Sequence, residues 1–78
     1  MAYRTKIAEG VVASSTDVRL SRGRTAREHH VYGLPFPARV WEDRTTGTCT
    51  VYVNHVEACQ RATLRAAYAQ IIEIAQEA

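Results

Sequence analysis

The stretch ARVWEDRTTGTCTVYVN, residues 38–54, contains two runs that are rich in β-branched and aromatic residues. The runs, residues 38–43 and 48–53, flank Arg44-Thr45-Thr46-Gly47, where the glycine can adopt the left-handed conformation that such a hairpin loop often requires. The sequence therefore predicts a β-hairpin. Alternation along its strands places one set of side chains toward a core, Val40, Cys49, Val51 and Val53, and the other set away from it, Arg39, Trp41, Asp43, Thr48, Thr50 and Tyr52.

The residues that follow this hairpin predict an amphipathic helix over residues 55–77. Asn54 and Glu57 have the spacing of a capping box, in which each side chain bonds a free backbone N–H at the helix start. At about 100° per residue, one broad stripe collects the side chains of Leu64, Ala67, Tyr68, Ile71, Ile74, Ala75 and Ala78. A helix with such a stripe needs a sheet or a second subunit to cover it.

An N-terminal hairpin is predicted over residues 3–20. Side chains alternate in character from Tyr3 to Ile7, as in a strand with one buried face. The polar cluster Ser14-Ser15-Thr16-Asp17 is typical of a turn, and Gly10 marks a place for a bulge or kink. Two hairpins in sequence would supply a sheet of three or four strands.

The segment between the hairpins, residues 21–37, fits two alternatives. Thr25 and Glu28 have capping-box spacing, and Gly33 would end a short helix over residues 26–32. The same segment contains HHVYGLPF, which fits an extended edge segment whose prolines block further pairing. The sequence leaves this choice open.

Together these elements predict one domain, residues 1–78, of the α+β class. It would consist of an antiparallel sheet of three to four strands, covered on one face by the C-terminal amphipathic helix, with or without a short helix near residues 26–32. A chain of 78 residues buries only about 60% of its unfolded surface, so a deep active-site cleft is not expected. Hydrophobic content of 46% with 23% charged residues is typical of a globular domain.

Positive charge is concentrated in the N-terminal half of the chain. Residues 1–40 hold seven Lys or Arg and three acids, whereas residues 41–78 hold three Lys or Arg and five acids, which together give the net charge of +2. The segment RLSRGRTAREHH, residues 19–30, contains four arginines, Arg19, Arg22, Arg24 and Arg27. Guanidinium groups bind phosphate or carboxylate through paired hydrogen bonds. The segment is therefore a candidate binding surface, with a solvated loop as the alternative.

The outer face of the hairpin over residues 38–54 is a second candidate surface. Trp41 and Tyr52 would lie side by side there, with Arg39 and Arg44 near them. Aromatic rings interleaved with cations are what single-stranded nucleic-acid platforms use for stacking and charge neutralisation. A dimer interface, or burial beneath the N-terminal hairpin, would account for the same residues.

No sequence motif for catalysis, metal binding or cofactor binding stands out. We therefore predict a non-enzymatic protein that uses neither a metal nor a cofactor. Ser14-Ser15 lacks the context of a nucleophile elbow. Glu42 and Asp43 point to opposite faces of a strand, so they do not form an acid–base pair. His55 and Cys59 have the i,i+4 spacing of two helical ligands, a spacing that is not specific for zinc.

Cys49 and Cys59 form no CxxC pair, which agrees with a reducing compartment. The most apolar stretch is far too short to cross a bilayer. We therefore expect a cytoplasmic protein without a membrane partner. His29 and His30 are expected to be partly exposed loop residues.

In size and layout the whole chain resembles the small inhibitor proteins encoded by phages and mobile elements, including anti-CRISPR proteins. Proteins of that class are single compact α+β or helical domains that have no catalytic motif and act by occupying a surface on a nucleoprotein complex. The resemblance implies a larger protein or nucleoprotein complex as partner. It also implies that the four arginines pair with acidic residues of that partner and that Trp41 or Tyr52 provides a central aromatic anchor.

Two other functions are alternatives. A basic nucleic-acid-binding module, such as a small regulator, would show binding that weakens steeply with salt. A homo-oligomeric structural subunit would use the helix stripe or the outer face of the sheet as its interface. The predicted partner-binding residues are Arg19, Arg22, Arg24, Arg27, Arg39, Trp41, Arg44 and Tyr52.

Overall fold

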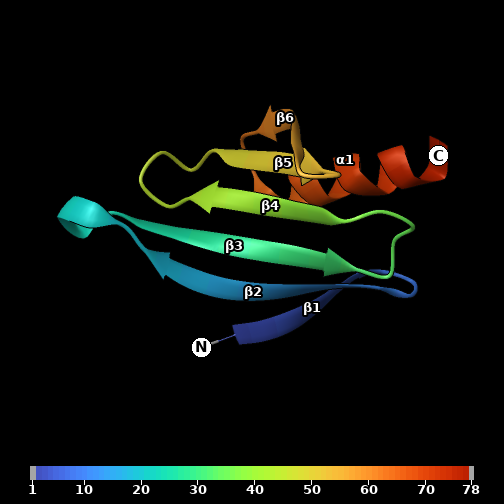
Figure 1. Cartoon of the computed structure of the whole chain (residues 1–78), viewed down its shortest axis with the longest axis horizontal. Coiled ribbons are helices and arrows are strands. Elements are labelled where there is room, and N and C mark those ends of the chain that lie inside the picture. Colours follow the sequence, from blue (N-terminus) through green and yellow to red (C-terminus); the bar gives the residue numbers. More distant parts are fainter. Residues whose placement is uncertain (1, 78) are drawn as a thin grey trace.

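The computed structural model describes residues 2–77, with side chains from Arg4 onward. Along this part of the chain lie β1 (Ala2–Ala8), β2 (Val11–Arg19), a 3-10 turn (Ser21–Gly23), β3 (Thr25–Tyr32), β4 (Ala38–Asp43), β5 (Cys49–Val53), β6 (Val56–Arg61) and α1 (Leu64–Glu77). Each strand pairs antiparallel with the next, so the sheet has the order β1-β2-β3-β4-β5-β6 (Figure 1).

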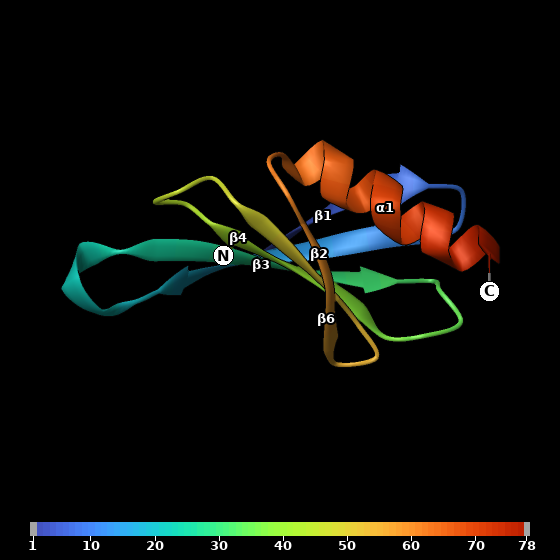
Figure 2. The same cartoon turned by 90° about the horizontal axis from the view of Figure 1, so that it is seen from above.

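The helix packs on one face of this sheet (Figure 2). It contacts β4, β5 and β6, and small or β-branched side chains fill the core between the two layers: Val11, Ala13, Val31, Ala38, Val40, Cys49, Val51, Ala67 and Ile71. No described element covers the opposite side of the sheet. We call that side the open face; it carries His30, Arg39, Trp41 and Tyr52.

The predicted number of strands was wrong, because the sheet has six strands where three to four were expected, within the same α+β class. Residues 26–32 belong to β3, so the short helix considered there does not form. Residues 14–17 lie inside β2 and not in a turn, since the first hairpin turns at residues 9–10. This hairpin extends the sheet beside β3 and does not cover β4 and β5.

The predicted helix start at His55 was also wrong. Asn54 and His55 have φ angles of 54° and 67°, the positive values that both central residues of a type I′ hairpin turn require. They therefore connect β5 to β6, and Glu57 lies within β6. The true helix is capped by Thr63, whose hydroxyl accepts a hydrogen bond from the backbone N–H of Ala66 at 3.1 Å.

Two parts of the prediction are confirmed. The hairpin over residues 38–54 forms as β4 and β5, and its inward residues Val40 and Val51 are fully buried. The apolar stripe of the helix faces the sheet, with Ala67 and Ile71 fully buried. Ala78, the last residue of the predicted stripe, lies outside the described residues.

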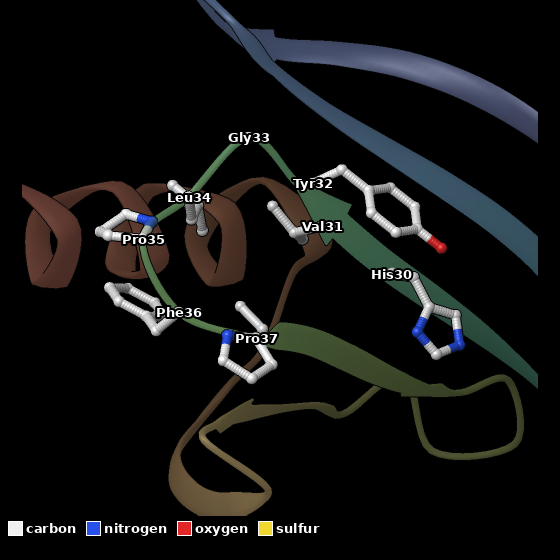
Figure 3. A pocket seen from close by; sticks show the side chains of 9 residues that line it. His30, Val31, Tyr32, Gly33, Leu34, Pro35, Phe36 and Pro37 are labelled. Carbon is white, nitrogen blue, oxygen red and sulfur yellow. The ribbon is translucent and has the colours of Figure 1, made fainter.

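The connection from β3 to β4 closes one end of the core. Gly33 has a φ of 97°, and a Cβ at this position would collide with the carbonyl oxygen of Gly10 in the β1–β2 turn. Leu34 packs against the core, on the side of α1 (Figure 3). The side chains of His30 and Tyr32 project from β3 away from the helix (Figure 3), so this end of the open face has polar and aromatic groups.

Candidate binding surfaces

The centre of the open face is built by three neighbouring strands. His30 of β3 is the register partner of Arg39 of β4, which is in turn the partner of Tyr52 of β5. In the next row Glu28 of β3 is the partner of Trp41 of β4. Because alternate residues of a strand share a face, all five side chains lie on the open face.

Arg39 is held between an aromatic ring and a carboxylate. Its guanidinium carbon lies 4.2 Å from the centroid of the Tyr52 ring, which is cation–π geometry. Its Nη1 donates a hydrogen bond to Glu28 Oε2 at 3.3 Å, and His30 Nε2 donates to the other oxygen of the same carboxylate. The positive charge of Arg39 is therefore compensated within the protein.

A shallow groove follows one edge of the open face. A concavity of about 180 Å³ is lined by His30, Pro37 and Tyr52 among other residues. It shares His30 and Pro37 with a larger concavity of about 420 Å³ formed by residues 30–38 (Figure 3). Tyr32 in this second concavity is 60% exposed. The groove thus presents aromatic rings that are accessible to a partner.

The predicted hairpin residues are only partly brought together. Trp41 and Tyr52 are both half-buried on the open face, but they are not direct partners. Tyr52 lies opposite Arg39, whereas Trp41 lies opposite Thr50. Arg44, which we expected near the rings, lies in the β4–β5 connection at the far end of the strands.

The β2–β3 and β4–β5 connections lie at that same far end of the sheet (left side of Figure 1), and five arginines lie in them or in the adjoining ends of β2 and β3. The backbone N–H of Arg44 donates to the carbonyl of Thr25 at 3.1 Å and so ties the two connections together. The β2–β3 tip projects furthest, and Arg22 within it has a φ of 63°. We call this region the arginine end, consisting of Arg19, Arg22, Arg24, Arg27 and Arg44.

Two carboxylates at the arginine end are engaged with arginines. Arg24 Nη2 lies 3.5 Å from Asp43 Oδ2, and Arg27 Nε donates to Asp17 Oδ1 at 2.7 Å. The hydrogen bond from Arg27 lowers the pKa of Asp17. The pKa of Asp43 is lowered chiefly by the backbone N–H of Thr45, which donates to its Oδ1 at 2.8 Å. Both acids are therefore ionised at neutral pH.

The remaining arginines of this region, Arg19, Arg22 and Arg44, form no ion pair with any residue that the structure describes. Arg19 and Arg44 line the same concavity of about 440 Å³, together with Thr25 and the Asp17–Arg27 pair. This concavity has the character of an anion-binding site, because two guanidinium groups that form no ion pair border it, although the carboxylate of Asp17 attracts that of Arg44.

A chain of hydrogen bonds that the sequence did not reveal links three strands beneath α1. Ser15 Oγ lies 2.6 Å from His29 Nδ1, and His29 Nε2 lies 3.0 Å from Glu42 Oε1. A carboxylate only accepts, so in the neutral imidazole Nε2 carries the proton and Nδ1 accepts from the serine hydroxyl. The ring of Tyr68 from α1 meets the His29 ring edge-on, with the centroids 5.9 Å apart.

Serine, histidine and carboxylate are also the members of hydrolytic triads, but this chain is not placed for such chemistry. Ser15 is 2% exposed and His29 is 1% exposed, so the hydroxyl is not accessible to a substrate in this arrangement. The chain of bonds instead satisfies polar groups that the sheet buries. The expectation that His29 and His30 are loop residues was wrong, because both lie in β3, and of the two only His30 is partly exposed.

His55 and Cys59, considered as two helical metal ligands, lie outside the helix that forms, α1. His55 is in the β5–β6 turn and Cys59 is in β6, so they do not have helical spacing. Among residues 2–77, no group of three or more potential metal ligands occurs.

Cys49 and Cys59 are both free thiols, and burial raises the pKa of Cys49. No helix in the described part of the chain is long and apolar enough to span a membrane.

Comparison of the chain with protein-family models, with curated proteins and with solved structures finds no match in any of the three. No residue role is therefore carried over from a relative.

Proposed function

We propose that the protein is a non-enzymatic binding protein that occupies a surface on a larger protein or nucleoprotein complex through its open face. The observation that carries this proposal is the uncovered centre of the sheet, where Arg39 stacks on Tyr52 beside Trp41. Tryptophan, tyrosine and arginine are the residue types that dominate the binding energy of protein interfaces.

The charge of the open face favours a protein partner there. Arg39 is compensated by Glu28, which also binds His30. A polyanion would have to compete with the carboxylate of Glu28 for the guanidinium group of Arg39. A protein surface of mixed charge can instead cover the aromatic side chains and form ion pairs with the charged side chains around them. Six strands spaced about 4.8 Å apart make a face about 24 Å wide.

A protein that occupies a surface of a complex prevents other molecules from binding to that surface. The phage-encoded inhibitors that the chain resembles in size and layout, anti-CRISPR proteins among them, act in this way. We therefore propose that the protein inhibits a larger complex of a host defence system by occupying its surface, without a cofactor. The two free thiols suit a reducing compartment, and the cytoplasm is the proposed place of action.

Photo-crosslinking in the native cells tests this proposal. A photoreactive phenylalanine analogue replaces Tyr52 on the open face, and the same analogue replaces Ala69, which is exposed on α1, as the matched control. The expected result is one discrete adduct from position 52 that excess wild-type protein displaces, with no adduct from position 69. An adduct between two copies of the chain would favour a homo-oligomer interface instead. Equal labelling from both positions would contradict the proposal.

A further inference from the structure

Arginines outnumber carboxylates at the arginine end. Arg27 lies in register between Asp17 and Glu42, so carboxylates flank it on both neighbouring strands. Arg24 is paired with Asp43. Arg19, Arg22 and Arg44 form no ion pair with any described residue, although the carboxylate of Asp17, whose pKa is lowered in part by the charge of Arg44, also attracts that guanidinium group.

Two of these charges converge on one preformed concavity. Arg19 is the last residue of β2 and Arg44 lies in the β4–β5 connection, yet both border the same space of about 440 Å³. The backbone hydrogen bond from Arg44 to Thr25 fixes the two connections relative to each other. Like charges that are held together repel, and an anion placed between them relieves that repulsion. The site is therefore organised for an anion before any ligand arrives.

A phosphate group fits this arrangement better than a carboxylate. A carboxylate is planar and is matched by a single bidentate guanidinium group, whereas the oxygens of a phosphate are accessible to guanidinium groups from several directions. Arg22 does not line the concavity and stands on the projecting tip (Figure 1). A ligand that also uses Arg22 must present a second anion nearby, as a nucleic-acid backbone does.

We propose that the arginine end binds the sugar–phosphate backbone of a nucleic acid, with Arg19 and Arg44 on one phosphate and Arg22 on a neighbouring one. Backbone contacts carry no direct sequence information, so this binding is independent of sequence. The inference goes beyond the proposed function, because it concerns a second site and stands whether or not the open face binds a protein. A nucleoprotein complex is a partner that would engage both surfaces.

Fluorescence anisotropy with short labelled single-stranded RNA, single-stranded DNA and duplex DNA tests this site on the whole chain. The variant Arg19→Ala/Arg22→Ala/Arg44→Ala removes the three unpaired charges. The variant Arg4→Ala/Lys6→Ala/Arg65→Ala is the matched control, since it removes the same charge from exposed positions elsewhere. Asp17→Asn removes a carboxylate that borders the concavity. Circular dichroism confirms that each variant is folded.

Three phosphate contacts predict that affinity for duplex DNA falls about 40-fold between about 50 mM and about 200 mM salt. The arginine-end variant is expected to bind at least about tenfold more weakly with a flatter salt dependence, and Asp17→Asn to bind more tightly. The control variant should bind like the wild type. Absence of wild-type binding at low salt, or equal losses in both triple variants, would overturn the inference. Displacement of the nucleic acid by millimolar inorganic phosphate at constant ionic strength would also overturn it, since the site would then take free phosphate.

Discussion

Arg39 stacks on Tyr52, with its guanidinium carbon 4.2 Å from the ring centroid, on a face of the sheet that no described element covers. If this face serves binding and not folding, removing one of its side-chain contacts should change the free energy of unfolding only a little. We expect Arg39→Ala to lower the free energy of unfolding by about 0.5–1 kcal/mol, because the cation–π contact and the pair with Glu28 are both accessible to solvent. Urea denaturation measures this, and a loss above about 2 kcal/mol would show that the face is needed for the fold.

The buried hydrogen bond between Ser15 and His29 should matter more for stability. Ser15→Ala leaves His29 Nδ1 without a donor beneath α1, and an unsatisfied buried polar atom costs about 1–3 kcal/mol. Ser14→Ala, one residue away on the open face, is the control and should change stability by less than about 0.5 kcal/mol. Equal effects of the two substitutions in chemical denaturation would rule out this role for the hydrogen bond.

Gly33 permits a close approach between the β3–β4 connection, which closes the core, and the β1–β2 turn. Gly33→Ala combines a positive φ with a collision against the carbonyl oxygen of Gly10. Gly47→Ala is the matched control, since it also has a positive φ but nothing lies within 4 Å of its added Cβ. The control should lose about 1–2 kcal/mol from backbone strain alone. The Gly33 variant should unfold at a clearly lower denaturant concentration, and coincident unfolding curves would contradict the tight approach.

Asp43 should make the β4–β5 connection sensitive to acid. Its pKa is held below the usual value of 3.8, chiefly by the backbone N–H of Thr45. A carboxyl whose pKa is lowered by folding contributes stability above its unfolded pKa, and this contribution is lost as the pH falls through the folded pKa. Thermal unfolding followed from neutral pH into acid should therefore show a smaller fall for Asp43→Asn than for the wild type. Parallel curves for the two proteins would contradict this prediction.

The sequence predicted the β4–β5 hairpin because its signals are local. Gly47 supplies the loop conformation and the strands alternate cleanly on both sides of it. At Asn54 the local signal was ambiguous, because asparagine suits both a helix N-cap and the positive φ of a type I′ turn. The pairing of β6 with β5 decides between them, and that interaction depends on the register of the whole sheet.

The middle of β2 and β3 was missed for the same reason. Ser15 and His29 are polar residues that locally favour a turn or a loop, and each becomes compatible with a buried strand only when it bonds the other across the sheet. The arginine-rich composition of the far end was visible in the sequence. The sequence could not show which of these arginines form ion pairs, because the pairs of Arg24 with Asp43 and of Arg27 with Asp17 depend on the tertiary structure.

The function of the open face is tested by the affinity of the protein partner that is captured at position 52, measured by isothermal titration calorimetry. Wild type, Tyr52→Ala and the control Arg65→Ala, which removes an exposed charge from α1, are compared. An interface anchor contributes at least about 2 kcal/mol, so Tyr52→Ala should weaken the Kd about 30-fold or more while Arg65→Ala stays close to the wild type. Binding of the Tyr52→Ala variant with wild-type affinity would contradict the open face as the binding surface.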